Sequence, residues 1–188
     1  ALELKSLNSA AAYRRLVIHG DGHQPAKDLL GQLRADDLFV KAIKNTDEAH
    51  AVLAGLWLWH DWLDESHMVS QNIHTPTGSY WHAILHRREG DFSNSKYWYA
   101  RCKDHPVMQA MASKAAAIVN ASEVGNDLNT VLAGGWSPPA MVDLVEQLDD
   151  KTNDKRELVR VDLQRSEWET LFDLCVHAAV KYRRCVRD

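Results

Sequence analysis

The sequence has no uninterrupted apolar run close to the roughly 20 residues that a membrane-spanning helix requires. It also has no N-terminal pattern typical of a secretory signal peptide. We therefore expect a cytoplasmic protein without a membrane partner. Because the chain begins with Ala1 and not with Met, earlier removal of a leader stays open.

Cysteine is scarce, and its three residues, Cys102, Cys175 and Cys185, form no CxxC pair. An odd number of unpaired cysteines argues against a disulfide framework and favours a reducing compartment. Cys175 lies in an apolar helical stretch, so we interpret it as a core residue. Cys102 lies between two basic residues, and we interpret it as exposed.

An excess of positive charge is also missing, since the formal net charge at pH 7 is −4. Without a basic field, nucleic acid is not an expected partner. Motifs with an established catalytic or nucleotide-binding role are absent, namely GxSxG, the Walker loop, GxGxxG, HExxH and zinc-ribbon spacing. Without such a motif, the sequence does not indicate the reaction class, and it does not indicate the oligomeric state either.

What the sequence does contain is helical periodicity and helix-capping residues. With 188 residues, 45% of them hydrophobic, the chain is long enough for one core. We predict an all-α fold, a single compact multi-helix domain over residues 1–188. Ser166 and Glu169 have the spacing of a capping box, which predicts the start of the last helix. Alternating apolar and charged residues over 159–163 are compatible with one short strand pair.

Two predicted helices are central to the functional argument. Thr46 is a suitable N-cap for a helix over residues 46–69, and Thr77 or Ser79 is predicted to begin a helix over residues 79–89. Roughly ten residues connect them, and connections of this length usually allow two helices to pack antiparallel.

Histidine is concentrated in and between these two helices, since five of the ten histidines lie in the stretch from His60 to His86. Four of them form two ladders with i, i+4, i+7 spacing, His60–Asp64–His67 and His82–His86–Glu89. This spacing places each ladder on one side of its helix. The first ladder follows the apolar face, where burying a carboxylate and two imidazoles is costly unless they are paired or bind a metal. We therefore predict a site for a divalent metal, zinc or iron, with the ligands His60, Asp64, His67, His82 and His86.

The second ladder is predicted at the edge of the apolar face, where it is more accessible to a ligand. In a metal-free alternative, His82 or His86 moves a proton while Arg87 or Arg88 holds an anionic substrate. The predicted catalytic residues are His82, His86 and Arg87. The predicted substrate-binding residues are their aromatic and polar neighbours, Tyr80, Trp81, Arg88, Asn94 and Trp98.

The favoured hypothesis is a small-molecule enzyme with its site between the helices over 46–69 and 79–89. Two other classes of function stay open. The chain could be a non-catalytic domain that binds a small molecule between the same aromatic and histidine side chains. It could also be a structural or interaction protein whose histidine network fixes the core, for example with Asp64 orienting His82.

One stretch carries a family resemblance. TPTGSYWHAILHRREGDFSNSKYWY, residues 75–99, followed by HPV at 105–107, resembles a family of bacterial and fungal proteins with no assigned activity. WSPPAMVDL at 136–144 and EWETLFDLC at 167–175 resemble later segments of that family. The resemblance covers about residues 50–180 and implies a single domain. It implies no catalytic residue.

Overall fold

The computed structural model describes residues 12–102, 104–124, 128–147 and 155–181. Within these ranges every regular element is helical, which confirms the all-α prediction. The elements are α2 (Gln24–Leu30), η1 (Ala35–Leu38), α3 (Thr46–Trp59), α4 (Leu63–Ser70), α5 (Pro76–Glu89), α6 (Phe92–Ala100), α7 (Pro106–Ala121), η2 (Asn129–Leu132), α9 (Pro138–Glu146) and α10 (Lys155–Val180). Cys185 lies outside the described residues. Among the described helices, none has the length and apolar character needed to cross a membrane.

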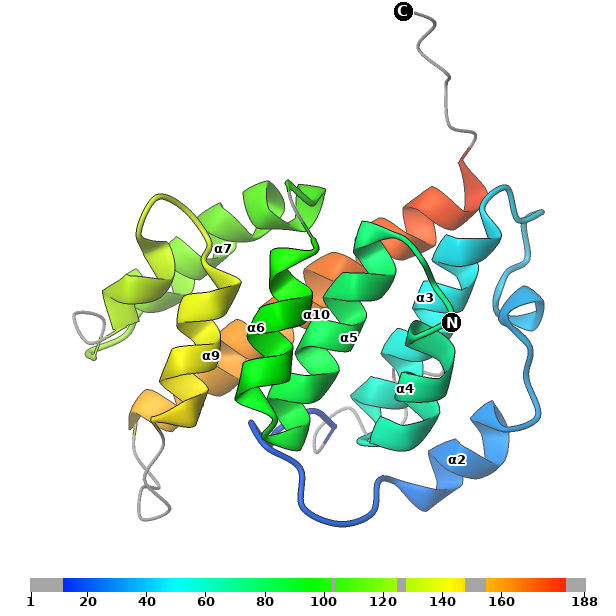
Figure 1. Ribbon diagram of the computed structural model, residues 1–188, viewed down its shortest axis with the longest axis horizontal. Helices are drawn as coiled ribbons and strands as arrows, with labels where there is room; N and C mark the ends of the chain where they lie inside the picture. The colour runs from blue at the N-terminus through cyan, green and yellow to red at the C-terminus, as the bar shows by residue number, and fades with distance from the viewer. Residues whose placement is uncertain (1–11, 103, 125–127, 148–154, 182–188) are drawn as a thin grey trace, which may run out of the picture.

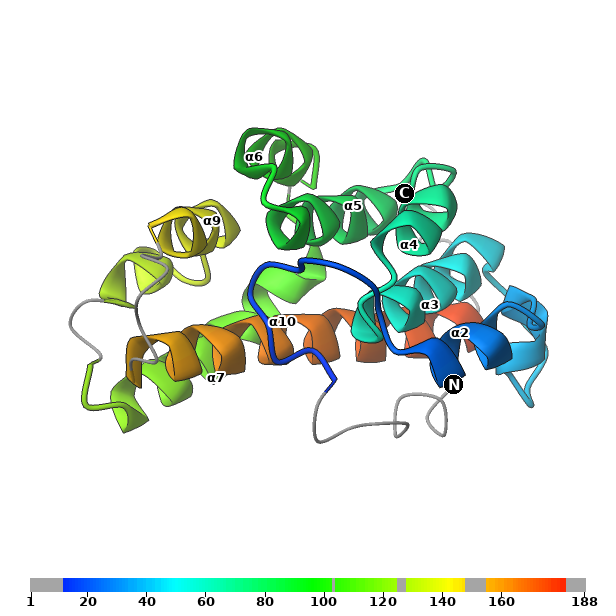
Figure 2. The same cartoon turned by 90° about the horizontal axis from the view of Figure 1, so that it is seen from below.

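The long helix α10 extends along most of the molecule, and both α3 and α7 pack against it (Figure 1). Figure 2 shows α5 and α6 above this layer, with α6 on the side of α5 that faces away from α10. Helix α4 contacts both α3 and α5. The helices that carry most of the predicted site therefore form the outer part of the fold, supported from below by α10.

The C-terminal prediction was wrong in two respects, because residues 159–163 and the Ser166–Glu169 pair both lie inside α10. The short alternation belongs to a longer helical pattern. The buried residues of α10 recur every three or four positions, at Val161, Gln164, Trp168, Leu171, Cys175 and Ala179. This stripe faces the core over several turns, and its burial outweighs both the local alternation and the local cap signal.

The prediction of one continuous helix over residues 46–69 was also wrong. Helix α3 ends at Trp59, and α4 begins at Leu63. Between them Asp61 has φ of 66°, in the left-handed region that aspartate tolerates better than most residues. Its carboxylate accepts hydrogen bonds from Arg15 at 3.0 Å and Arg88 at 2.8 Å. Contacts with distant residues therefore stabilise the break, which no Gly or Pro marks in the sequence.

The helix starts are shifted by one to a few residues from the predicted caps. The side chain of Asn45, and not of Thr46, accepts the hydrogen bond from the Glu48 N–H. The Thr75 hydroxyl caps α5 by accepting from the Gly78 N–H, so this helix begins before Thr77. In both cases a residue with an N-capping side chain lies immediately before the first helical position.

A buried ion pair joins α5 to α10. The Arg87 guanidinium donates to the Glu167 carboxylate at 2.6 Å, and both side chains are 0% exposed. Tyr80 and Tyr99 donate their hydroxyls to the other carboxylate oxygen, at 2.8 Å and 3.1 Å. Burial lowers the pKa of Arg87, but the Glu167 carboxylate and nearby tyrosines more than offset this and leave it above its ordinary value. Arg87 is therefore a permanent cation in the core.

We predict that Glu167→Gln lowers the free energy of unfolding by about 3–5 kcal/mol, because it leaves the buried guanidinium without its counter-charge. Urea denaturation followed by circular dichroism measures this loss. The control is Lys96→Ala, which removes a half-exposed cation paired with Asp143 and Glu146 and should cost at most about 1 kcal/mol. Equal losses in the two variants would contradict the central role of the pair.

Candidate functional site

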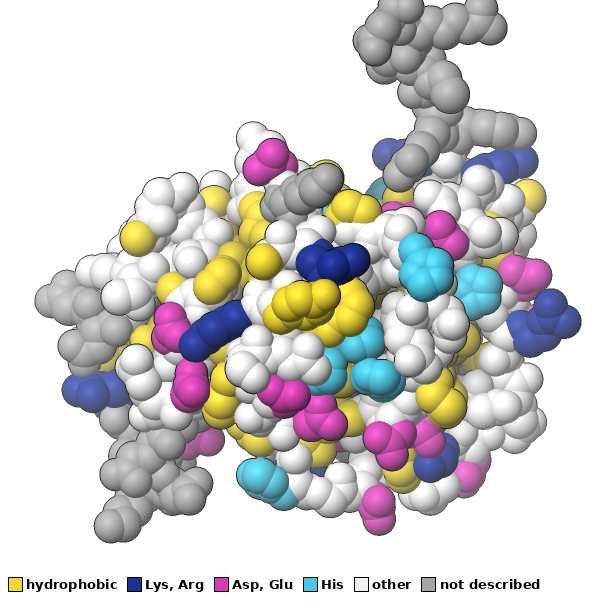
Figure 3. Space-filling model, viewed as in Figure 1, with side chains coloured by type: hydrophobic (Ala, Val, Ile, Leu, Met, Phe, Trp, Pro, Cys, Tyr) yellow, Lys and Arg dark blue, Asp and Glu magenta, His cyan; other side chains and the backbone are white. Residues whose placement is uncertain are grey.

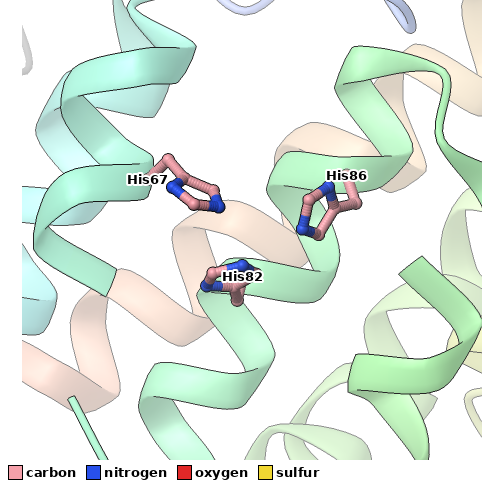
Figure 4. A group of neighbouring side chains, drawn as sticks. All are labelled: His67, His82 and His86. Atoms are coloured by element: carbon pink, nitrogen blue, oxygen red, sulfur yellow. The ribbon is translucent and has the colours of Figure 1, made fainter. Parts of the chain in front are cut away.

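Three histidines converge between α4 and α5 (Figure 4). His67 comes from α4, and His82 and His86 come from successive turns of α5. Each offers a ring nitrogen, and these nitrogens all lie within 4.8 Å of one another. The ring centroids of His67 lie 4.5 Å from His82 and 5.7 Å from His86, and those of His82 and His86 are 4.8 Å apart. We call these three residues the histidine cluster.

The spacing of residues along α5 explains why two histidines of the cluster point away from α10. Tyr80 and Arg87 are seven residues apart, so they share the side of α5 that is bonded to Glu167 on α10. His82 and His86 are four residues apart and lie on the opposite side. That side faces α4 and α6, and α4 supplies the third histidine.

Hydrogen bonds fix the orientation of His86. Its Nδ1 lies 2.8 Å from a Glu89 carboxylate oxygen, which can only accept, so Nδ1 carries the proton. In the neutral ring the lone pair is then on Nε2, which lies 3.1 Å from the Asn94 side-chain amide. A carboxylate that receives the proton of one ring nitrogen and orients the other is the usual outer partner of a metal-binding histidine.

His82 is the most enclosed member of the cluster, with 3% of its surface exposed. Its Nδ1 lies 3.4 Å from the Ser70 hydroxyl, and its ring lies 4.3 Å from the Trp98 ring. Burial, together with the neighbouring His86 and His67, lowers the pKa of His82 to about 4. At neutral pH this imidazole is therefore uncharged and has a lone pair available for a ligand.

Two residues of the predicted metal set lie away from the cluster. His60 follows α3 directly, is buried, and has its ring 5.9 Å from that of His23. Asp64 is in the first turn of α4 and is exposed. The helix break at Asp61 removes the helical register that would have aligned His60 with His67. Asp64 shares α4 with His67, but its side chain lies on the exposed side of that helix. The first ladder therefore contributes only His67 to the cluster.

The two arginines of the predicted site are both buried, with 0% of each side chain exposed. Arg87 is bonded to Glu167, and Arg88 donates to the Leu58 carbonyl at 2.7 Å and to Asp61. Tyr80 and Trp81 are also fully buried in the core. These four side chains hold the fold together at positions that a ligand cannot reach in this conformation. Of the predicted binding residues, Asn94 and Trp98 contact the histidine cluster directly.

A cavity of about 540 Å³ adjoins the cluster. Its wall includes Ser70 and Trp98, the two residues that contact His82, and also Arg101. The Arg101 guanidinium lies 5.4 Å from the centre of a Trp98 ring. Figure 3 shows histidine side chains gathered near the middle of one face, beside hydrophobic side chains and a basic one. A molecule in this cavity would contact Ser70 and Trp98, the two neighbours of His82, and would lie within reach of the Arg101 guanidinium.

A second polar group, which no sequence pattern indicated, is formed by Glu48, Thr77 and His105. The Thr77 hydroxyl donates to the Glu48 carboxylate at 2.9 Å and lies 3.1 Å from His105 Nε2. These residues are 29 and 28 positions apart, so no local spacing could have signalled their contact. The only local signal is His105 immediately before Pro106, a position from which its side chain caps α7.

The interpretation of Cys102 as exposed was wrong, whereas Cys175 is a core residue as predicted. Cys102 is 1% exposed, and its thiol donates to the Trp98 carbonyl at 3.3 Å. Burial, with a smaller effect of Glu167, raises its pKa to about 12. The thiol therefore stays protonated at neutral pH and does not act as a nucleophile.

No family model, curated protein sequence or solved structure matches this chain. The family resemblance of residues 75–99 thus stays a prediction. The geometry of the site is therefore the main indication of function.

His105 should make the protein sensitive to acid. Burial lowers its pKa from 6.5 to about 4, so the unfolded chain takes up this proton first as the pH falls. Its contribution to stability is complete above about pH 6.5 and is lost progressively towards pH 4. The difference between the urea-derived free energies of unfolding at pH 7.5 and 4.5 should be smaller in His105→Gln, by roughly 2–3 kcal/mol. An unchanged difference in this variant would contradict the assignment.

Proposed function

We propose that His67, His82 and His86 bind a zinc ion, and that the protein is a zinc-dependent hydrolase of a small anionic molecule. The observation that supports this best is the approach of three histidine ring nitrogens to within 4.8 Å of one another. Two further features agree with it. His82 is neutral at neutral pH, as a ligand must be, and Glu89 orients the ring of His86.

The donor set favours zinc over iron. Three histidines with one open position are a common ligand set of catalytic zinc, whereas non-haem iron enzymes typically use two histidines and a carboxylate. Among the described residues, the cluster contains no carboxylate ligand, because Glu89 is bonded to the far nitrogen of His86. Iron is therefore the weaker of the two predicted alternatives.

Zinc binding requires a modest contraction of the cluster. Zinc–nitrogen bonds of 2.0–2.1 Å in a tetrahedral arrangement place the ligand nitrogens about 3.3 Å apart. The largest separation here is 4.8 Å, so the rings must move together by about 1.5 Å. Asn94 must also give up its contact with His86 Nε2. His67 and Asn94 are partly buried, so rotation of these two side chains can bring His67 closer and release His86 Nε2 without moving a helix, whereas His82 and His86 are buried.

The chemistry follows from the open fourth position. Zinc lowers the pKa of a bound water to about 7 and thereby supplies hydroxide at neutral pH. The adjoining cavity would hold the substrate against the Trp98 ring, while the Arg101 guanidinium pairs with its carboxylate or phosphate. This arrangement favours hydrolysis of a small molecule whose anionic group lies several bonds away from the bond that is cleaved.

The alternative is a metal-free network. Ser70, Glu89 and Asn94 together give His82 and His86 hydrogen-bond partners without any ion. In that case the histidines serve packing alone, and the cavity is a binding pocket or has no ligand.

Zinc titration of the metal-free protein, prepared without a histidine tag, distinguishes a zinc site from a metal-free structural network. We expect one equivalent to bind, and His82→Ala or His86→Ala to abolish binding. Glu89→Gln should weaken it by about 10–100-fold, because Glu89 orients His86. The matched control is His74→Ala, which removes an exposed histidine outside the cluster and should leave binding unchanged. Absence of zinc binding, with a loss of several kcal/mol of stability in the His82 and His86 variants, would establish the structural network instead.

A pair of model esters tests the predicted reaction and charge preference. We expect the zinc-loaded protein to hydrolyse 4-acetoxybenzoate with a higher kcat/KM than the neutral 4-acetoxybenzamide. Arg101→Gln should raise the KM for the anionic ester by about tenfold, the equivalent of about 1.4 kcal/mol, and leave the neutral ester unaffected. Zinc binding without hydrolysis of either ester would retain the metal site and reject the hydrolase.

A further inference from the structure

A second cavity, of about 510 Å³, lies where α3, α5, α7 and α10 meet. Its apolar wall is formed by prolines at the starts of two helices and by side chains of α10, namely Pro76, Pro106, Leu174 and Ala178. Its polar side is formed by Glu48, Thr77 and His105. A volume in this range, with mostly apolar walls and a few convergent polar groups, is typical of a small-molecule site.

The hydrogen bonds on the polar side have a defined direction. The Val107 N–H donates to His105 Nδ1 at 3.2 Å, so the proton of the neutral ring is on Nε2. Nε2 then donates to the Thr77 hydroxyl at 3.1 Å, and that hydroxyl donates to Glu48 at 2.9 Å. These hydrogen bonds therefore all run in one direction, from His105 through Thr77 to the Glu48 carboxylate, which is the final acceptor.

The Glu48 carboxylate is buried, and no cation of the described part of the chain pairs with it. The residue is 8% exposed, and the side-chain partners of its carboxylate are the Thr77 hydroxyl and the Cys175 thiol. Among the described residues, Glu48 forms no ion pair, and no Lys or Arg lines the cavity. Asp104 adds a second carboxylate to the wall, and His105 is uncharged because burial lowers its pKa. A buried carboxylate of this kind is costly unless an opposite charge compensates it.

We propose that this cavity binds a small organic cation, an ammonium group on an aliphatic or aromatic body. The ammonium would pair with Glu48, and the body would pack against the two prolines and Leu174. An anionic ligand is disfavoured by both carboxylates. The two thiols of the wall, Cys102 and Cys175, are kept protonated by burial, which raises the pKa of each, so the cavity binds its ligand without covalent chemistry.

This site is distinct from the histidine cluster and does not depend on zinc. None of His67, His82 and His86 lines it. The two cavities adjoin at Thr75 and Pro76, which line both. The start of α5 therefore separates a cavity with an arginine in its wall from one with two carboxylates.

Three probes of similar shape test the charge preference by isothermal titration calorimetry. We expect 2-phenylethylammonium to bind, 2-phenylethanol to bind at least tenfold more weakly, and 3-phenylpropanoate not to bind. Glu48→Gln should reduce the affinity for the ammonium probe to that for the alcohol. The matched control is Asp104→Asn, which neutralises the exposed carboxylate and should have a smaller effect. Equal affinities for the three probes, or no binding of the ammonium probe at all, would overturn the proposal.

A second variant keeps the test valid if Glu48→Gln does not fold. Leu174→Trp would fill the cavity from the partly buried side of α10 while leaving Glu48 in place, and it should abolish binding of 2-phenylethylammonium. His82→Ala should bind this probe as tightly as the unmodified chain does. Loss of binding in His82→Ala but not in Leu174→Trp would place the cation at the histidine cluster and reject this cavity. The result is independent of whether zinc binds.

Discussion

The buried ion pair between Arg87 and Glu167 is the interaction on which the rest of the structure depends. The cost of removing both charges from water requires that they meet, and this requirement fixes the rotation of α5 about its own axis. Once Arg87 faces α10, His82 and His86 must face away from it. The position of the histidine cluster is therefore a consequence of core electrostatics and not of a local motif.

The neighbouring arginine performs the equivalent function for the third histidine. Arg88 reaches the end of α3, where it bonds the Leu58 carbonyl and the Asp61 carboxylate. Asp61 in its left-handed conformation turns the chain into α4, which carries His67. Two consecutive arginines of one helix thus position both elements that form the cluster. Substitution of either arginine would therefore affect the site through its geometry, without any contact to a ligand.

The sequence predicted the all-α fold, the shared side of His82 and His86, and the burial of Cys175, because each depends on periodicity within helices. It did not predict the break at Asp61, since the residues that stabilise it are 46 and 27 positions away. Nor did it predict the burial of Arg87 and Arg88, because charged side chains are exposed unless a partner is known. The partner of Arg87, Glu167, lies 80 residues away. Contacts of this range are decided by tertiary packing, which one sequence does not reveal.

The two candidate sites select different cations for physical reasons. Zinc needs several lone pairs that converge on one point, and the histidine cluster offers three imidazole nitrogens in a small volume. The Glu48 cavity offers a buried carboxylate, while Thr77 and His105 already direct their protons towards it. Neither nitrogen of His105 has a free lone pair, because Nδ1 accepts from the Val107 N–H and Nε2 donates to Thr77, so this polar group offers no converging set of metal ligands. Within the described ranges, the Glu48 carboxylate has no ion-pair partner. A ligand that fills a cavity of about 510 Å³ with apolar walls must be larger than a metal ion and partly apolar. The compensating positive charge is therefore expected on an organic cation.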